Sequence, residues 1–325
     1  MPRRPGSQPS LRAPALPVVH LARDFPPSYP AARVREGAWI RVRPGAYVDA
    51  SPDADRHTRE RTVALARIIA VRDQLRAPYV LGHESAALLW GLPLLGNPDR
   101  TTVFALTKPT GRSVDVVRHV HRLPLAHTTI RLGHPVTTLE RTVVDCAMTL
   151  GGRAGLMVAD AALHAGVPRE RCLEILESMA GHRGVVVARA ILDLADDGAE
   201  SPGESSARFV LLRAGLPVPQ TQVRVDTHLG SFWSDLGWPE WRLLAEYDGR
   251  AKYEANGSAS EAVIEEKRRQ DAIQEADWRV LRITKEDINA PDRLVRRVVR
   301  AAPAGAVGGL RPRAALVVPP SRSSF

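Results

Sequence analysis

The stretch that decides the fold is SFWSDLGWPEWRLLAEYDG, residues 231–249. Two runs rich in aromatic and apolar residues flank Pro239-Glu240, and this arrangement predicts a β-hairpin. If the loop consists of these two residues alone, Asp235 on the first strand faces Leu244 on the second. A four-residue loop preserves the same division of side chains between the two faces, whereas a loop of odd length destroys it.

With that parity, three carboxylates project from one face of the hairpin: Asp235, Glu246 and Asp248. The diagonal from Asp235 to Glu246 spans about 7–8 Å between backbones, within reach of two carboxylates that converge on one cation. Three such groups repel one another unless a cation or a proton intervenes. The sequence therefore predicts Mg²⁺ at this face, and Lys252 follows closely enough to bring an ammonium group back over it.

The hairpin is preceded by a predicted helix that begins at Ser201-Pro202-Gly203-Glu204. Ser is a preferred N-cap, Pro suits the first helical position, and a glutamate three residues after the cap completes a capping box. Glu204 also stands four residues before Arg208, a spacing typical of a helical ion pair. Two roles stay open for Glu204, a structural one at the helix start and a catalytic one.

Downstream of the hairpin, residues 265–271 predict a charged helix and residues 278–283 a final strand. Lys267 and Arg268 on this helix are candidates for phosphate contacts. The alternative is a solvated helix face, with Lys267 paired to Asp271 and Glu265 to Arg269.

Taken in order, these pieces resemble the very-short-patch-repair (Vsr)-like endonuclease domain of the PD-(D/E)XK superfamily. They are the helix with Glu204, the strand with Asp235, the run EYDGRAKY at 246–253, the charged helix and the last strand. The resemblance covers about residues 200–290. It implies an α/β fold of restriction-endonuclease type, with a central mixed sheet flanked by helices, and metal-dependent hydrolysis of a phosphodiester.

The resemblance assigns a place in the motif to each candidate residue. Asp235 matches the first aspartate and Glu246 the (D/E) position. Asp248 stands where the motif usually has lysine, and Lys252 fills a basic position six residues after the glutamate. Glu204 matches a helical glutamate that some members use.

The mechanism that the resemblance implies uses one Mg²⁺, or Mn²⁺ in its place, held by Asp235, Glu246 and the Tyr247 carbonyl. In that scheme Lys252 orients the attacking water and Asp248 holds a second ion. The expected activity is a DNA endonuclease. The alternative function is a non-catalytic DNA-binding regulator, or an antitoxin with a degenerate nuclease fold and a toxin as partner, and the identity of residue 248 discriminates between the two.

Near the N-terminus, residues 31–50 alternate and turn at Pro44-Gly45, which predicts a two-stranded ribbon. The ribbon resembles the wing of the small winged helix that opens AbiEi-like antitoxins, and Arg41 and Arg43 would lie where phosphates are met. Upstream, Pro26, Pro27 and Pro30 interrupt the place where a recognition helix should run, because proline lacks an N–H and clashes inside helices.

The middle of the chain predicts helices at about 57–76, 83–91, 137–150, 153–165 and 168–195, with strands between 101 and 132. The order of these pieces resembles the middle region of AbiEi-type proteins, an α+β domain. The histidines of this region follow no ligand spacing, and they are expected to be polar surface or satisfied core. The predicted domains are a disordered start at 1–18, a partial winged-helix segment at 19–56, a middle domain at 57–197, a nuclease domain at 198–300 and a disordered tail at 301–325.

The composition limits the class of protein. The 325 residues carry 45 Lys+Arg against 36 Asp+Glu, a net charge of +9, and the excess of basic residues falls before residue 196. A basic front half suits a polyanion such as DNA. No apolar run is long enough to span a membrane, and two cysteines are too few for a disulfide framework. The chain is therefore expected to be cytoplasmic, with DNA rather than a membrane as its partner.

Overall fold

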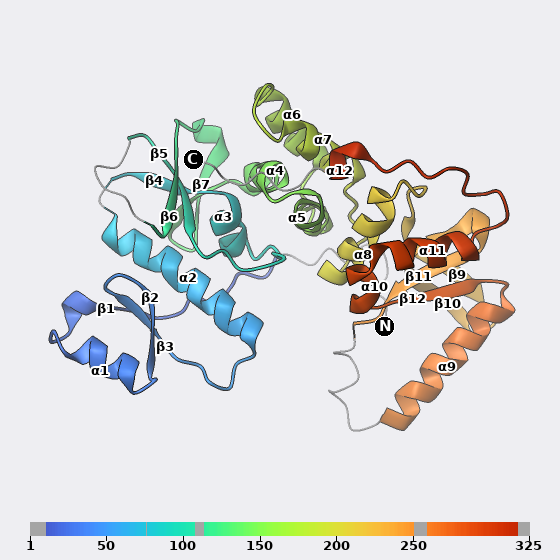
Figure 1. Ribbon diagram of the computed structural model, residues 1–325, viewed down its shortest axis with the longest axis horizontal. Coiled ribbons are helices and arrows are strands. Elements are labelled where there is room, and N and C mark those ends of the chain that lie inside the picture. The colour runs from blue at the N-terminus through green and yellow to red at the C-terminus, as the bar shows by residue number, and fades with distance from the viewer. Residues whose placement is uncertain (1–10, 76, 108–113, 250–258, 318–325) are drawn as a thin grey trace. The chain divides into compact units, whose positions relative to one another are not determined.

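The computed structural model describes residues 11–75, 77–107, 114–249 and 259–317, with side chains in the last range from residue 264 onward. The chain forms two compact units, one over Leu11–Cys146 and one from Ala147 onward (Figure 1). Helices combine with one antiparallel and two mixed sheets, so the predicted α/β fold class is confirmed.

The first unit opens with a three-stranded antiparallel sheet in the order β1-β3-β2. Its strands are β1 (Val19–Leu21), β2 (Trp39–Arg43) and β3 (Ala46–Asp49). β2 and β3 form the predicted ribbon, and Gly45 supports the turn with a left-handed φ of +71°. A small apolar core lies between this sheet and α2 (Arg56–Gln74).

The expectation that prolines prevent a helix before the ribbon is wrong. Residues Tyr29–Arg35 form α1, and Pro30 lies in its first turn. The first N–H groups of a helix have no intrahelical partner, so a proline there sacrifices no hydrogen bond. The ribbon is therefore preceded by a short helix, with Arg33 and Arg35 in its last turn.

The rest of the first unit is a five-stranded mixed sheet in the order β6-β5-β4-β8-β7. Its strands are β4 (Tyr79–Leu81), β5 (Thr101–Ala105), β6 (Val116–Val120), β7 (Thr128–Arg131) and β8 (His134–Thr137). The predicted helices of this region appear as α2, α3 (His83–Trp90) and α4 (Leu139–Thr149). α3 ends at Gly91, which adopts a left-handed φ of +84° where a Cβ would meet the Arg12 carbonyl oxygen at 2.2 Å.

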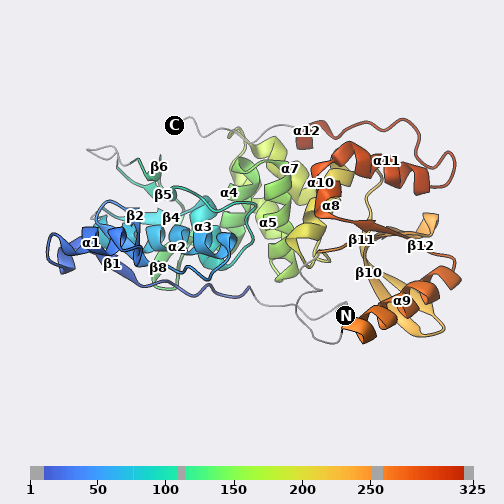
Figure 2. The ribbon, with the colours of Figure 1, turned by 60° about the horizontal axis from the view of Figure 1, so that its bottom comes forward.

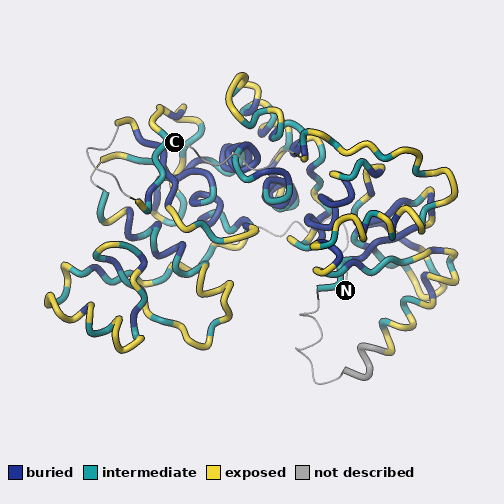
Figure 3. The backbone as a smooth tube through the Cα atoms, viewed as in Figure 1, coloured by how far each residue is buried: buried dark blue, intermediate teal, exposed yellow. Residues whose placement is uncertain are grey.

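The second unit begins with helices that the sequence assigned to the middle domain. They are α5 (Gly152–His164), α6 (Arg169–Ser178) and α7 (Val185–Leu194), followed by α8 (Pro202–Arg213). α5 is buried along most of its length (Figure 3). Arg208 of α8 pairs with Asp160 of α5 at 2.7 Å, with both side chains fully buried, and not with Glu204. This packing places the border between the units at residue 146 rather than at 197.

A four-stranded mixed sheet forms the centre of the second unit, in the order β12-β11-β10-β9. β9 (Gln220–Thr227), β10 (Gly230–Trp238) and β11 (Leu243–Tyr247) are antiparallel neighbours. β12 (Arg279–Ile283) lies parallel to β11, because the chain crosses over through α9 (Ala259–Glu275). The predicted final strand and charged helix are therefore confirmed.

Helices cover both faces of this sheet, as Figure 2 shows. One core joins α8, α10 (Lys285–Asn289) and α11 (Pro291–Ala301) to Leu236, Trp238 and Leu243 of the sheet. The other core joins α9 to Val223, Val225 and Leu244. Since Leu243 and Leu244 are consecutive, they face opposite cores, as alternation along a strand requires.

The central hairpin has a four-residue turn instead of the two-residue loop. Trp238 pairs with Leu243, and Pro239–Trp241 form one turn of 3₁₀ helix. Arg242 closes the turn with a left-handed φ of +50°. The even loop length preserves the parity, but the register is shifted by two residues.

The predicted disorder after residue 300 is wrong for the described part of the tail. Residues Ala314–Val317 form the short helix α12, and Leu316 is only 2% exposed. Arg313 donates to the carbonyls of Leu212 and Leu216 at the C-terminal end of α8. The Leu212 carbonyl also accepts the Gly215 N–H at 3.0 Å, so the guanidinium adds a further contact at the end of α8 and anchors the tail there.

Candidate active site

Glu204 lies in the first turn of α8 and is 8% exposed. Its N–H donates to Ser201 Oγ at 3.2 Å, which confirms the predicted N-cap. Its carboxylate accepts from the Ser201 hydroxyl at 2.7 Å and from the Glu200 N–H at 2.8 Å. The side chain therefore closes the start of the helix, and it does so with a buried carboxylate.

Asp235 lies on β10 beside the end of β11, and its Oδ2 accepts a hydrogen bond of 2.7 Å from the Tyr247 N–H. The paired register of β10 and β11 ends with Leu236 opposite Ala245, one residue before Asp235 and Glu246. This shift of two residues removes the diagonal arrangement that was predicted for these two side chains.

The regular alternation of β10 fails at Asp235. Phe232 packs against the core below α9, whereas Leu236 belongs to the core below α8, although residues four apart in a regular strand share a face. On the neighbouring strand, Gln222 has a left-handed φ of +47°. With this irregularity, Asp235 acts on Glu204 of α8, whereas Glu246 contacts Arg269 of α9 on the other face of the sheet, so the predicted convergence of the carboxylates on one face is wrong.

Asp235 and Glu204 influence each other electrostatically. Burial and then the negative charge of Asp235 raise the pKa of Glu204 to about 7, while its hydrogen bonds to Ser201 and Glu200 act in the opposite direction. Two carboxylates that share a buried site cannot both ionise without a cost. Near neutral pH, Glu204 is consequently poised between its protonated and charged forms.

The ring of Tyr247 packs against the first turn of α8 at Gly203. A Cβ at Gly203 would lie 2.0 Å from Cε1 of the Tyr247 ring, so only glycine allows the ring to pack there. Arg153 of α5 donates from Nε to Ser206 Oγ at 3.3 Å, and burial lowers the pKa of this arginine although the nearby Tyr247 raises it. An aromatic ring and a guanidinium therefore border the carboxylates.

Glu246, the other predicted metal ligand, is bound to two arginines. Its Oε1 lies 2.5 Å from Arg269 Nη2 of α9, and its Oε2 lies 2.9 Å from Arg282 Nη1 of β12. Glu266 contacts the same two arginines, with 3.3 Å to Arg269 Nη1. Burial alone would lower the pKa of Arg269, but Glu246 and Glu266 raise it. Glu246 is therefore electrostatically compensated by two guanidinium groups.

Two further predicted residues follow β11. The Asp248 N–H donates to the Ile283 carbonyl at 2.8 Å, which extends the parallel pairing by one residue, and its side chain is half-buried. Lys252 lies outside the described residues. The predicted lysine near the carboxylates is therefore not placed.

The oxygen donors at the end of β11 fit a magnesium ion in part. Within the described ranges, no three His, Cys, Asp or Glu side chains are grouped closely enough to hold a metal ion. Glu204 and Asp235 supply two carboxylates, and Tyr247 adds a carbonyl, because the N–H and C=O of one strand residue point to the same side and its N–H meets Asp235. These are the oxygen ligands that Mg²⁺ prefers.

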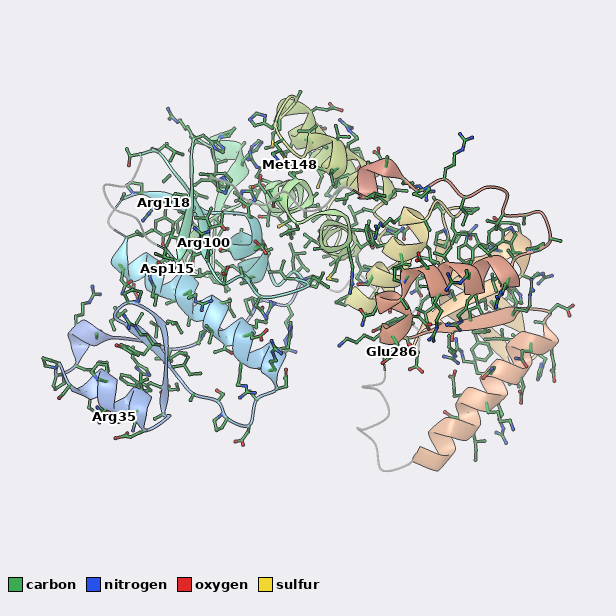
Figure 4. All side chains as sticks on the ribbon, viewed as in Figure 1. Arg35, Arg100, Asp115, Arg118, Met148 and Glu286 are labelled. Atoms are coloured by element: carbon green, nitrogen blue, oxygen red, sulfur yellow. The ribbon has the colours of Figure 1, made fainter. Side chains whose placement is uncertain are left out.

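The two arginines of the ribbon that were predicted to bind phosphate, Arg41 and Arg43, differ in exposure and in ion pairing. Arg41 is exposed on β2. Arg43 is instead paired at 2.9 Å with Asp115, which Figure 4 labels, and its side chain is 8% exposed. Arg43 is therefore a poor candidate for DNA binding, because its charge is already compensated. A one-residue irregularity in the β2–β3 pairing between Arg41 and Arg43 accompanies this difference.

On α9, Lys267 and Arg268 are both exposed, and the described residues provide no ion pair for either. The alternative pairing of Glu265 with Arg269 is wrong, since Arg269 turns to Glu246 and Glu266. Both cations remain available to a polyanion.

Sequence reasoning missed Arg282 as a partner of Glu246. The two positions are 36 residues apart, and Arg282 occurs in a strand pattern that suggested packing alone. The parallel register, which sets Glu246 beside Arg282, would have indicated the pair. Sequence reasoning also missed the stacking of His83 on His119, with ring centroids 4.5 Å apart, where burial lowers the pKa of both to about 4.

The second unit thus defines an α/β protein with a carboxylate pair at the start of a helix and an arginine-bound glutamate on the adjacent strand.

No protein-family model matches the chain. Over 272 residues it is 30% identical to the uncharacterized protein Rv2248 of Mycobacterium tuberculosis strain ATCC 25618 / H37Rv, covering 82% of this chain and 94% of that protein. The same values hold for the uncharacterized protein MT2308 of strain CDC 1551 / Oshkosh. The chain belongs to the family of these proteins.

Among solved structures, the chain is similar to the RV2827C protein from Mycobacterium tuberculosis, with a TM-score of 0.34 and 19% identity over 59% of this chain and 75% of that one. This likeness is too distant to define a shared fold. Within the described residues, every helix is too short or too polar to cross a membrane.

Proposed function

We propose that this chain is a Mg²⁺-dependent DNA endonuclease of the Vsr-like type, which hydrolyses phosphodiester bonds at the end of β11. The observation that carries the proposal is the pair Glu204 and Asp235. Burial and the charge of Asp235 raise the pKa of Glu204 to about 7. Carboxylates held together against their repulsion are typical of sites that receive a cation.

The order of elements in the second unit supports the proposal. A helix, three antiparallel strands, a crossover helix and a parallel strand follow one another from α8 to β12, with helices on both faces. This is the mixed sheet flanked by helices that the resemblance to the Vsr-like domain implies. Because one fold hosts many functions, the residues of the site and not the fold define the activity.

Each residue has a defined contribution in this proposal. Glu204, Asp235 and the Tyr247 carbonyl would hold the ion, and Glu204 gives up its proton as they do. When bound, Mg²⁺ supplies polarisation of the phosphate and a lower pKa for the attacking water. Mn²⁺ is expected to replace it at the same oxygen donors.

The DNA contacts proposed here come from exposed cations. Lys267 and Arg268 on α9 belong to the second unit, and Arg41 lies on the ribbon that resembles an AbiEi-like wing. Removal of a phosphate-contacting cation should weaken DNA binding uniformly across sequences.

The rival proposal is a DNA-binding regulator or antitoxin without catalysis. One observation favours it: Glu246 is bound by Arg269 and Arg282 and is not free to hold an ion while these pairs persist. Aspartate at position 248, where the motif has lysine, points the same way. In this reading the second unit is a scaffold and the ribbon is the main DNA contact.

Calorimetric titration with Mg²⁺ and Mn²⁺, run beside a plasmid-nicking assay, separates the two proposals. The endonuclease proposal expects ion binding and nicking by the parent protein and loss of both in Asp235→Ala/Glu246→Ala. A matched control, Asp226→Ala/Glu240→Ala, removes two exposed carboxylates of the same sheet region and should behave like the parent. If the parent binds no ion and nicks no plasmid, the regulator proposal replaces the first one.

A further inference from the structure

A groove lies at the C-terminal end of α8, at the opposite end of this helix from Glu204. Its volume is about 640 Å³, within the range of about 300–1,000 Å³ that small-molecule sites occupy. The lining residues come from α8, from the first two turns of α11 and from the tail, which Figure 1 shows returning from the end of α11 to α12. Segments that are distant in sequence therefore build one groove.

The tail is fixed in place as one wall of this groove. The Arg313 N–H donates to the Arg213 carbonyl at 3.0 Å, and Leu316 beyond it is buried. Gly215 has a left-handed φ of +89°, and a Cβ there would lie 2.1 Å from the Arg311 carbonyl oxygen, so only glycine allows the tail to cross the end of α8 this closely. The groove is therefore largely preformed, as small-molecule sites usually are.

The groove has an apolar surface. Val210 is buried, Val295 and Leu310 are half-buried, and Val317 is exposed. Apolar surface that solvent still reaches gains free energy when a ligand covers it. These side chains are all aliphatic, and they suit the aliphatic body of a ligand.

Two exposed arginines, Arg213 and Arg296, also line the groove. Among the described residues, no carboxylate lies within ion-pair distance of either guanidinium, although Asp292 lines the same groove. By contrast, Arg297 on the same helix pairs with the buried Asp287 at 2.6 Å. A guanidinium offers a fork of N–H donors that matches a carboxylate, so the two uncompensated arginines suit an anionic head group.

We propose that this groove binds a free aliphatic carboxylate, an amphiphilic anion with a single apolar chain. The chain covers Val210, Val295 and Leu310, and the carboxylate binds Arg213 and Arg296. Charge complementarity identifies the head group, since two cations and one acid line the groove. The site goes beyond the proposed function, because it requires neither a metal ion nor DNA.

Calorimetric titration of the full chain with octanoate, butanoate and octanol tests the chain and the head group separately. At full burial each methylene would tighten binding about 4-fold. Because solvent reaches the groove, we expect octanoate to bind at least about 10-fold more tightly than butanoate. Octanol lacks the charge, and we expect it to bind about 10-fold more weakly than octanoate, as loss of ion pairs with two exposed arginines should produce. Equal binding of octanoate and butanoate would overturn the proposal.

The double variant Arg213→Gln/Arg296→Gln should bind octanoate and octanol equally, because both cations are removed. Arg300→Gln is the matched control, since Arg300 is exposed on α11 but does not line the groove. This control should retain the parent's preference for octanoate. A double variant that keeps the same preference would overturn the proposal.

A second variant, Val317→Glu, tests the groove without removing a cation. Val317 is exposed, so a polar side chain there costs little stability. The new carboxylate repels the head group, and we expect it to weaken octanoate binding about 3-fold or more while octanol binding changes less. Octanoate binding at the parent's affinity by a folded Val317→Glu protein contradicts the proposal.

Flotation with phosphatidylglycerol vesicles separates a free ligand from a lipid surface. The proposal expects the parent to bind octanoate and to remain unbound by the vesicles. If the vesicles bind the parent through Arg213 and Arg296 and octanoate does not bind, the groove meets a membrane surface and the proposal fails. It also fails if neither binds. Mg²⁺ binding and plasmid nicking do not enter these measurements, so such a failure leaves the endonuclease proposal as it stands.

Discussion

Asp235 and Glu246 lie on adjacent strands of the same sheet, but different groups surround their carboxylates. Glu246 has two guanidinium partners, at 2.5 Å and 2.9 Å. Asp235 accepts a backbone N–H and lies near a second carboxylate, whose pKa burial and Asp235 raise to about 7. Glu246 thus stabilises the fold through ion pairs, whereas Asp235 repels a second carboxylate, and a pair of carboxylates of this kind is the better candidate for ion binding.

The largest expected effect is the loss of unfolding free energy caused by the substitution Glu246→Ala. Glu246→Ala leaves Arg269 and Arg282 with Glu266 as their shared partner, and breaking a buried ion pair on one side costs about 3–5 kcal/mol. Since Arg282 is 36% exposed, we expect the lower end, about 3 kcal/mol, from urea unfolding.

Asp235→Ala is the partner experiment. It removes one hydrogen bond, worth about 1 kcal/mol, together with the repulsion of Glu204, so its unfolding free energy should stay within about 1 kcal/mol of the parent's. If Glu246→Ala and Asp235→Ala lose the same unfolding free energy, the two carboxylates do not differ in their contribution to stability.

Ionisation of Glu204 is expected to have a smaller effect on the unfolding free energy, and this effect depends on pH. Because its folded pKa of about 7 lies above the ordinary value of 4.5, the folded state binds the extra proton between these two values. The contribution of Glu204 to the unfolding free energy is therefore largest below pH 4.5, and it is lost as the pH rises to 7.

Glu204→Gln removes the charge, so we expect it to stabilise the protein by about 1–2 kcal/mol at pH 8 and by much less at pH 5. Thermal unfolding at the two pH values measures the difference. A Glu240→Gln control, at an exposed position in the turn between β10 and β11, should have no such pH dependence. If Glu204→Gln is equally destabilising at both pH values, the carboxylate acts only as a cap.

Sequence reasoning succeeded where one local pattern determines the result. The hairpin and the cap at Ser201 follow from contiguous residues, and the even loop preserves the expected alternation for Leu236 to Trp238 but not for Asp235. The register was missed because the turn closes through Arg242 at a φ of +50°, a conformation that a sequence pattern does not specify.

Other features depend on contacts between distant parts of the chain. Arg313 anchors a tail with no periodicity by bonding to Leu216, 97 residues earlier. Glu246 meets Arg269 and Arg282 only after α9 has returned the chain to the sheet. Composition predicted disorder for the tail, and the hairpin pattern with the family resemblance predicted a metal ligand at Glu246. Neither contains the packing that brings Arg313, Arg269 and Arg282 to their partners.

Two arginines of the ribbon, Arg41 and Arg43, differ in the same way in whether a carboxylate compensates their charge. Their substitution is expected to have the smallest effect, and this effect is on DNA affinity. Arg41 is exposed, whereas Arg43 is paired with Asp115. If Arg41 meets a phosphate, Arg41→Gln should weaken binding to any duplex by about 3-fold and reduce the slope of log affinity against log salt by about 1. Arg43→Gln should leave that slope unchanged, because its charge is already compensated by a carboxylate within the fold. Fluorescence anisotropy across a salt series measures both slopes. Equal slopes in the two variants and the parent would remove the ribbon from the DNA contact and leave the exposed cations of α9 to account for it.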